Sequence, residues 1–168
     1  MANKKGLEQQ VSPKWKFLQE NLGFKATLNM FGPYIGAGIS VDEVNESKTR
    51  IAVSMVLNWF NENYVGTQFG GSLYSMGDPF YMFILMANLG EDYLVWDKKA
   101  EIEFVRPGTG KVSAVFEISE DELNEIRQVV AQKKKTDWVF QTEITGEDGE
   151  VVARLIKTLY IRGLKKKK

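Results

Sequence analysis

Hydrophobic and polar residues alternate along much of this chain, a period that is typical of strands with one buried face. Residues 37–58 predict two strands in this way. Residues 138–145 and 151–161 predict a hairpin around the turn at Gly146–Gly149. Because the predicted strands follow one another in hairpins, we expect an antiparallel sheet of five or six strands.

A long strand is predicted over residues 94–104. Strict alternation places one set of residues on an apolar face: Leu94, Trp96, Ala100, Ile102 and Phe104. It places a second set on a polar face: Asp97, Lys99, Glu101 and Glu103. Lys98 then falls on the apolar face, and the pattern does not explain it. Beyond the turn at Arg106–Gly110, residues 112–118 alternate again, so we expect these two strands to form a hairpin.

Helix signals flank the predicted sheet. Ser12-Pro13 is a typical helix start and Gly23 a typical stop, which predicts an N-terminal helical arm over residues 1–24. The aromatic segment 24–35 is expected to be a loop. Ser119 and Glu122 have the spacing of a capping box and predict the start of an amphipathic helix.

The segment 72–87 differs from the other predicted helices because apolar residues cover nearly its whole circumference. A helix that is apolar all round must be buried all round. Strands wrapped around one central helix provide that burial. The sequence therefore predicts an α+β fold in which an antiparallel sheet encloses a buried helix.

Composition narrows the possible chemistry. The chain has 168 residues, which fits a single domain, and it contains neither His nor Cys. Triads that use His, thiolate nucleophiles and metal sites built from His or Cys are therefore excluded. Catalysis would have to use carboxylates, amides, hydroxyls, Lys, Arg or backbone N–H groups. We expect no metal and no bound cofactor.

Charge and hydropathy bear on partners and location. The 22 basic residues balance the 22 acidic ones, but four of the basic residues form the tail Lys165–Lys168, which leaves 18 basic against 22 acidic. A body with excess negative charge argues against nucleic acid as the main partner. The run Phe80–Ala87 is too short for a membrane span, and the first residues lack an apolar signal region, so we expect a cytoplasmic protein.

Several motifs together resemble the hotdog-fold acyl-CoA thioesterases, in particular the phenylacetate-pathway enzymes. The stretch Gly66–Gly71, with Met76–Pro79 and Trp96–Lys98, is similar to a group of tetrameric acyl-CoA thioesterases. The resemblance covers about residues 25–162 and implies a hotdog domain over 25–164. The motif residues are Asn63-x-x-Gly66-x-x-Phe69-Gly70-Gly71, then Asp78, then Phe104-x-Arg106-Pro107-x-x-Gly110.

The resemblance implies a catalytic set. Asp78 would be the carboxylate, acting as general base or as nucleophile, and Asn63 would position water or the substrate carbonyl. The N–H of Gly70, beside Gly71, would be the main oxyanion donor, since the first N–H groups of a helix have no partner within it.

The resemblance also implies residues that contact acyl-CoA. Phe69 stands where relatives usually carry His, and Gln68 is the nearest polar side chain that could replace it. Arg106 and Lys111 flank a turn where relatives often bind the CoA phosphates, and Tyr74 is a further substrate-binding candidate. As solvated surface charges, Arg106 and Lys111 would have no such role.

Spacing predicts an oligomer. Gly70 and Asp78 lie eight residues apart, about 12 Å along one continuous helix at about 1.5 Å per residue. One carbonyl cannot contact both groups of the same helix, so we expect Asp78 to come from a second protomer across a two-fold interface. A homodimer or a dimer of dimers is therefore expected.

Each motif also has a purely structural interpretation. Asp78-Pro79 could simply restart or kink the helix, and the pair Gly70-Gly71 could serve a tight turn. Asn63 could cap its own loop. The main functional hypothesis is an acyl-CoA thioesterase. The alternatives are a non-catalytic acyl-binding module on the same fold and, disfavoured by the missing His, a hydratase or a partner of acyl carrier protein.

Overall fold

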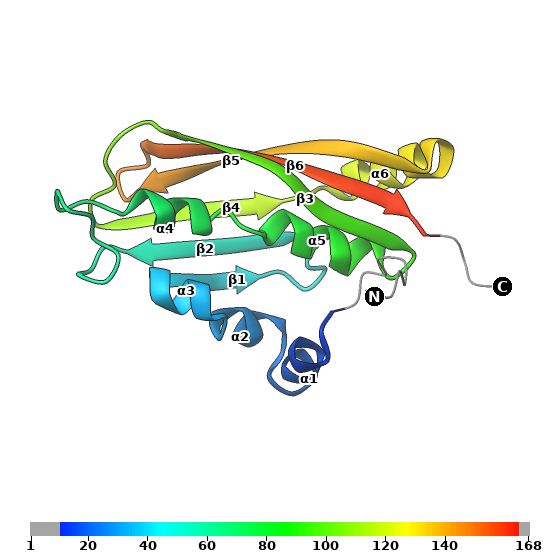
Figure 1. Cartoon of the computed structure of the whole chain (residues 1–168), viewed down its shortest axis with the longest axis horizontal. Coiled ribbons are helices and arrows are strands. Elements are labelled where there is room, and N and C mark those ends of the chain that lie inside the picture. The colour runs from blue at the N-terminus through cyan, green and yellow to red at the C-terminus, as the bar shows by residue number, and fades with distance from the viewer. Residues whose placement is uncertain (1–10, 165–168) are drawn as a thin grey trace, which may run out of the picture.

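A six-stranded antiparallel sheet forms the body of the computed structural model, which describes residues 11–164 (Figure 1). The predicted tail Lys165–Lys168 lies outside these residues. The strands are β1 (Ile39–Val44), β2 (Arg50–Val56), β3 (Tyr93–Phe104), β4 (Lys111–Glu117), β5 (Lys135–Gly146) and β6 (Val151–Gly163). Their order across the sheet is β1-β2-β4-β5-β6-β3. The predicted α+β class with an antiparallel sheet is confirmed.

Six helices accompany the sheet in the described part of the chain. They are α1 (Pro13–Leu22), α2 (Phe24–Asn29), α3 (Gly32–Ala37), α4 (Gly70–Ser75), α5 (Phe80–Leu89) and α6 (Glu120–Lys133). The predicted start and stop of α1 are confirmed. The predicted loop over 24–35 is wrong, because α2 and α3 occupy most of it. The capping box of α6 is confirmed by a 3.1 Å hydrogen bond from the Glu122 N–H to Ser119 Oγ.

The buried helix is interrupted. The sequence predicts one helix over 72–87, but α4 ends at Ser75 and α5 begins at Phe80, with a cis peptide bond between Asp78 and Pro79. Pro79 cannot donate a backbone hydrogen bond, so the break falls where the helix ladder cannot continue. The predicted burial is correct for the second part, since α5 buries Phe80, Ile84 and Leu85 completely.

Strand pairing corrects the predicted hairpin around Arg106–Gly110. β3 pairs with β6 and not with β4, which lies between β2 and β5. The segment after β3 is therefore a crossover that carries the chain from one edge of the sheet to its middle. The hairpins β1–β2 and β5–β6 are confirmed.

A β-bulge at Lys98 corrects the predicted faces of β3. The pairing register with β6 shifts between Asp97 and Lys99, so one extra residue is accommodated at Lys98. Asp97 opposes the inward-facing Leu159, whereas Trp96 opposes Tyr160 on the outer face. The strict alternation assumed from the sequence is thus wrong before the bulge, and Asp97 faces the helices.

Aromatic rings fill the space between α5 and the sheet. Phe80 packs on Tyr34 and on Phe116 with ring centroids 5.3 and 4.9 Å apart, and Tyr81 stacks on Phe140 at 4.6 Å. These contacts join α3, α5, β4 and β5 in one hydrophobic core. These contacts hold the start of α5, directly after the helix break, against the sheet.

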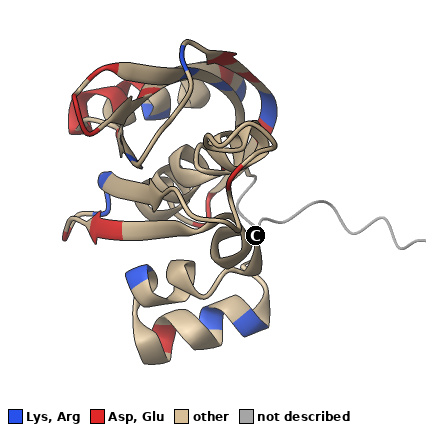
Figure 2. Ribbon diagram, turned by 90° about the vertical axis from the view of Figure 1, so that its left-hand side faces the viewer, with Lys and Arg blue, Asp and Glu red and all other residues tan. Residues whose placement is uncertain are grey.

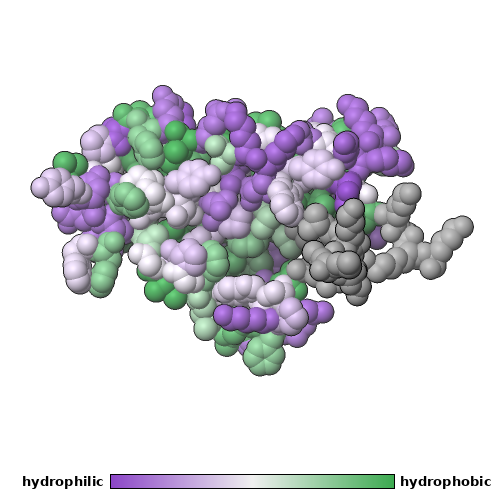
Figure 3. All heavy atoms as spheres, in the orientation of Figure 1, coloured by the Kyte–Doolittle hydropathy of each residue, from purple (hydrophilic) through white to green (hydrophobic). Residues whose placement is uncertain are grey.

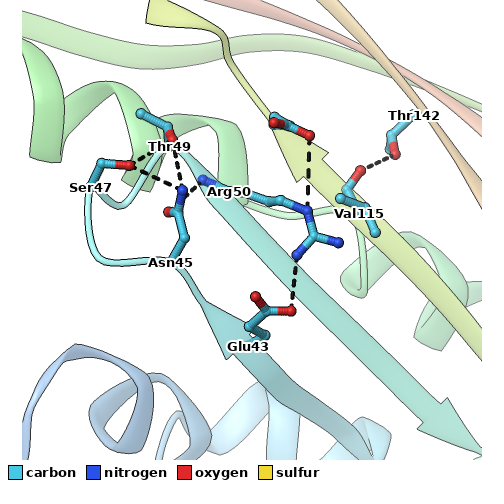
Figure 4. A network of polar contacts seen from close by, with 8 residues as sticks. Glu43, Asn45, Ser47, Thr49, Arg50, Val115 and Thr142 are labelled. Atoms are coloured by element: carbon cyan, nitrogen blue, oxygen red, sulfur yellow. Dashed lines mark hydrogen bonds and ion pairs between the residues drawn. The ribbon is translucent and has the colours of Figure 1, made fainter.

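Polar contacts define the turn between β1 and β2 (Figure 4). The Asn45 Oδ1 accepts a 2.9 Å hydrogen bond from the Arg50 N–H, and its amide nitrogen donates to Ser47 and Thr49. The Arg50 guanidinium lies 2.9 Å from Glu43, on the neighbouring strand. This network sets the register of the β1–β2 hairpin at its turn.

The two edges of the sheet differ. The N-terminal helices lie along β1 (Figure 1), where the Asn29 side chain bonds both the N–H and the C=O of Val41 at 2.7 and 3.1 Å. At the other border of the sheet, β3 is an edge strand, with β6 as its one neighbouring strand within residues 11–164. Acidic and basic residues are interspersed along the ribbon (Figure 2), and polar and apolar side chains intermix on the face in Figure 3.

Candidate functional site

Two carboxylates and one ammonium meet at the break between α4 and α5. The Lys157 Nζ donates a short hydrogen bond to Asp78 Oδ1 and lies 3.0 Å from Asp97 Oδ1. The Lys157 side chain is 3% exposed, whereas the Asp78 side chain is 45% exposed. We call these three residues the carboxylate–lysine cluster. It places a buried cation directly behind an accessible carboxylate.

Three elements bring the cluster together. Asp78 lies in the helix break, and Lys157 occupies an inward position of β6 between Leu155 and Leu159. Asp97 comes from β3, where the bulge at Lys98 turns it inward. The exposed Lys98 itself pairs with Asp137, which explains its position without a role in the core.

Burial and charge shift the protonation of the cluster. Burial raises the pKa of Asp97, and the hydrogen bond and charge of Lys157 only partly oppose this rise. For Lys157, burial alone would lower the pKa, but the hydrogen bonds and charges of Asp78 and Asp97 outweigh it and raise the pKa. Lys157 is therefore an ammonium at neutral pH, which excludes it as a nucleophile, since a nucleophilic Lys needs a lowered pKa.

Tyr34 fixes the backbone of the cluster. Its hydroxyl donates a 2.7 Å hydrogen bond to the backbone oxygen of Asp78, and its ring is 1% exposed. Burial, with smaller contributions from the charges of Asp78 and Asp97, raises the pKa of the Tyr34 hydroxyl above its usual range. The hydroxyl therefore stays protonated and donating.

The glycine pair begins α4. Gly70 and Gly71 occupy the first two positions of this helix, whose N–H groups have no acceptor within it. A Cβ on Gly70 would lie 3.0 Å from the Phe104 ring, and one on Gly71 would overlap the Phe69 ring. The glycine pair thus allows close packing against the Phe69 and Phe104 rings. It also presents helix N–H groups beside these two half-exposed rings.

Asn63 and Gln68 hold the loop before this turn. The Asn63 side chain accepts from the N–H groups of Val65 and Thr67 and donates to Thr67 Oγ1 at 2.8 Å, as a loop-capping residue does. The Gln68 side chain is buried, donates to Gly110 O at 3.0 Å, and leaves its own Oε1 without a partner. Both amides therefore support the loop that presents Phe69.

The predicted substrate-binding residues lie in different settings. Phe69 and Tyr74 are partly exposed, at 55% and 39%. Arg106 is ion-paired with Asp148 in the β5–β6 turn and also donates to Glu150 O at 3.2 Å. The Lys111 side chain is exposed at the start of β4. Arg106 is thus engaged in holding a turn, and Lys111 is the freer of the two cations.

The cluster also shows what sequence reasoning missed. Lys157, Asp97 and Tyr34 were not singled out as functional candidates, although Lys157 breaks an otherwise apolar series on the inner face of β6. That series is Ala153, Leu155, Leu159 and Ile161. The premise of a continuous helix between Gly70 and Asp78 is wrong, so their separation does not follow from helix rise alone.

The rest of the described surface adds nothing to the site. A hollow over β3, β5 and β6 is lined by charged, polar and apolar side chains, and in it Arg154 pairs with Glu103 and Glu143. Within residues 11–164 no group of three or more carboxylates could hold a metal ion. No helix in the same range is long and apolar enough to cross a bilayer.

Solved structures share this architecture at low sequence identity. A Pseudomonas aeruginosa protein of unknown function, described as a probable thioesterase, is 16% identical with a TM-score of 0.68, over 94% of this chain and 99% of its own. The thioesterase HI1161 from Haemophilus influenzae is 16% identical with a TM-score of 0.59, over 95% and 96% of the two chains. The E. coli PaaI protein, from the phenylacetic acid degradation operon, is 16% identical with a TM-score of 0.57, over 83% and 89%.

These similarities define the class: the protein has the hotdog fold, as its motifs predict, and its structural neighbours include thioesterases. Residues 21–161 match DUF4442, a domain of unknown function, and the chain belongs to this family. No curated protein sequence matches.

Proposed function

We propose that the protein hydrolyses acyl-CoA thioesters to a free acid and CoA. The observation that carries the proposal is the accessible Asp78 carboxylate, which follows a helix that begins with two glycines in a hotdog fold. Hotdog neighbours described as thioesterases support the same reaction class. A cytoplasmic location, as expected from the sequence, is part of this proposal.

Asp78 would provide the reactive oxygen. As a general base it takes a proton from water, whose oxygen then forms a bond to the thioester carbon while the C–S bond breaks. As a nucleophile it forms an acyl–carboxylate anhydride and releases the CoA thiolate, and water then hydrolyses the anhydride. Both routes end with the same acid, and the thiolate takes up the remaining proton. Gly70 N–H would stabilise the oxyanion in each.

We propose a two-fold dimer with two equivalent sites. β3 is an edge strand and can pair with the same strand of a second copy, because antiparallel pairing of one strand with itself is compatible with two-fold symmetry. β3 also carries Asp97 and Phe104, so an interface along it would lie beside the cluster and the glycine turn. Asp78 of one protomer would then serve the Gly70 N–H of its partner. A dimer of dimers is compatible with the same site.

The acyl group and CoA would contact different residues. The half-exposed rings of Phe69 and Phe104, with Tyr74 nearby on α4, provide apolar contacts beside the glycine turn. Lys111 is better placed than Arg106 to bind CoA phosphates, since Arg106 would first have to leave Asp148. Asn63 would act on water or carbonyl only indirectly, through the loop that it caps.

The test is thiol release from a panel of aliphatic and aryl acyl-CoAs. We expect turnover by the wild type and a loss of about 100-fold or more for Asp78→Asn, the range typical of a removed acid–base group. Asp137→Asn is the matched control, because it removes an exposed carboxylate that is paired with Lys98 away from the cluster. Equal turnover by Asp78→Asn and wild type would refute the assignment of Asp78.

The second candidate is a non-catalytic acyl-binding module. Phe69, at the position where the resembled enzymes usually have His, favours it. Calorimetry with a non-hydrolysable acyl-CoA thioether, run beside the thiol assay, separates the two functions. Binding by wild type and Asp78→Asn without release by either would establish the module and reject the hydrolase.

A further inference from the structure

We propose that Lys157 is a positioning residue for this hydrolysis: its ammonium, held between Asp78 and Asp97, fixes the Asp78 carboxylate in one orientation. The inference rests on the proposed function and adds a residue that the motif resemblance does not include. It follows from three observations on the carboxylate–lysine cluster, namely the geometry, the position in the strand and the charge balance.

The geometry gives Lys157 one place to act. The ammonium bonds Asp78 Oδ1, and no other described side chain donates to that carboxylate. The second oxygen is therefore available to water or to a carbonyl carbon, while the first is fixed. Because Lys157 extends from a central strand, the anchor is rigid, whereas Asp78 lies in a break between helices.

The strand position argues against a role in stability alone. Lys157 is flanked on the inner face of β6 by Leu155 and Leu159, where an apolar residue could pack without losing hydration. A buried ion pair is weak evidence for stability, because desolvation offsets most of the attraction. A lysine that is desolvated in order to meet a half-exposed carboxylate is better explained by what that carboxylate does.

The charge balance makes the cluster sensitive to pH. Two carboxylates face one ammonium, and the neutral hydroxyl of Tyr34 is the remaining titratable group packed against them. Asp97 Oδ1 is buried and lies 3.0 Å from the Lys157 Nζ. The cluster therefore carries one excess negative charge. Removing the Lys157 ammonium would increase this excess, whereas removing the Asp97 carboxylate would abolish it.

The first arm of the test replaces the ammonium. In Lys157→Met, we expect kcat to fall about 100-fold with KM within about threefold, because Asp78, the acid–base group that Lys157 orients, contributes this much. The acid limb of the pH–rate profile should move to higher pH, since two carboxylates without a cation take up a proton more readily. Lys157→Arg keeps the charge and should restore the acid limb. Lys98→Met is the control at an exposed lysine.

The second arm keeps the proposal testable if Lys157→Met does not fold. Asp97→Asn preserves shape and removes the competing negative charge, so Lys157 serves Asp78 alone. We expect the acid limb of this variant to move to lower pH. A purely structural role of Lys157 would lower the folded fraction of Lys157→Met and leave kcat of the folded enzyme unchanged. An unmoved acid limb in Asp97→Asn would overturn the proposal.

A direct measurement separates this proposal from the proposed function. Carboxyl carbon NMR follows the titration of Asp78 and Asp97 in the wild type, Asp97→Asn and Lys157→Arg, without substrate. If Asp78 titrates at lower pH in Asp97→Asn while no acyl-CoA is hydrolysed, the electrostatic coupling within the carboxylate–lysine cluster is supported and the proposed hydrolase activity is rejected. If turnover is present but neither the titration nor the acid limb responds, Lys157 is not a positioning residue.

Discussion

At the residue scale, the cluster shows how one side chain can be recognisable in sequence and still be overlooked. Lys157 interrupts a period of inward apolar residues, so alternation alone could have marked it. Its partners could not be predicted in this way. Asp97 reaches Lys157 only because β3 contains a bulge and pairs with β6, and neither property follows from the local pattern.

Because of Lys157, we expect the free energy of unfolding to change with pH in the alkaline range. Its pKa in the folded protein lies above the ordinary value of 10.5, so its ion pairs stabilise the fold fully below pH 10.5. That contribution is lost as the pH rises through the folded-state pKa. The pair as a whole adds little stability, but removing one partner leaves the other charge uncompensated. We therefore expect Lys157→Met to lower the free energy of unfolding by about 3 kcal/mol at pH 8, because the largely buried Asp97 carboxylate loses its cation.

Urea unfolding at pH 8 and at several values above pH 10.5 measures this effect. The difference between wild type and variant should shrink progressively over that range. Both proteins also lose stability there through their tyrosines, since burial raises the pKa of Tyr81 to about 12 and its unfolded form ionises first. Comparing the two proteins at each pH cancels that common loss. A difference that stays constant would show that the Lys157 ion pairs do not contribute.

At the element scale, the elements were predicted better than their faces and partners. Apolar periodicity identified the strands and the burial of α5, because burial depends on local pattern. The helix break was foreseen only as the structural interpretation of Asp78-Pro79, and the bulge at Lys98 was noted only as an unexplained lysine. Bulges and sheet order depend on pairing between distant segments, which a local pattern does not record.

The bulge provides an element-scale prediction. Deleting Lys98 would remove the bulge and leave Asp97 opposite Leu159 and Lys99 opposite Thr158, so both parts of β3 would keep their present faces. We expect Val95 to stay in the core and Asp97 to stay in the cluster, so the deletion should cost about 1 kcal/mol of stability and should retain thiol release.

Lys98→Ala is the control for this deletion. It keeps the extra residue and removes only the exposed ion pair with Asp137, which is worth about 0.5 kcal/mol. Thermal unfolding and the thiol assay measure both variants. A deletion variant that is much less stable and much less active than Lys98→Ala would contradict this account of the bulge.

At the scale of the whole molecule, the resemblance of the motifs carried the prediction further than periodicity did. It provided the hotdog fold, which the neighbouring structures confirm. The dimer stays a prediction, because the argument from helix rise assumed a helix that is in fact broken. The edge position of β3 is now the better physical reason to expect it.

Subunit complementation tests the shared site. Asp78→Asn and Gly70→Val should each be inactive as homodimers, the second because a side chain at Gly70 would meet the Phe104 ring and crowd the oxyanion position. A heterodimer of the two has one intact site, so we expect about half of the wild-type activity for a two-fold dimer.

Light scattering on the same samples should give twice the chain mass of 19.1 kDa, or a multiple of that. Co-expression with two different tags isolates the heterodimer from the parent homodimers. A heterodimer as inactive as its parents would mean that Asp78 and Gly70 act within one protomer. A fully active monomer would exclude the interface altogether.

The asymmetry between the sheet's two borders limits how far such assembly can extend. Asn29 already occupies the backbone groups of Val41, and the register of β1 is irregular next to that residue, so a further strand finds no ladder there. A molecule that can add a strand on only one side forms a closed pair and cannot propagate into a fibre through its strands. In a dimer joined along β3, the N-terminal helices would thus prevent the addition of a further strand at β1, and a chain that begins at Phe31 would lose that protection.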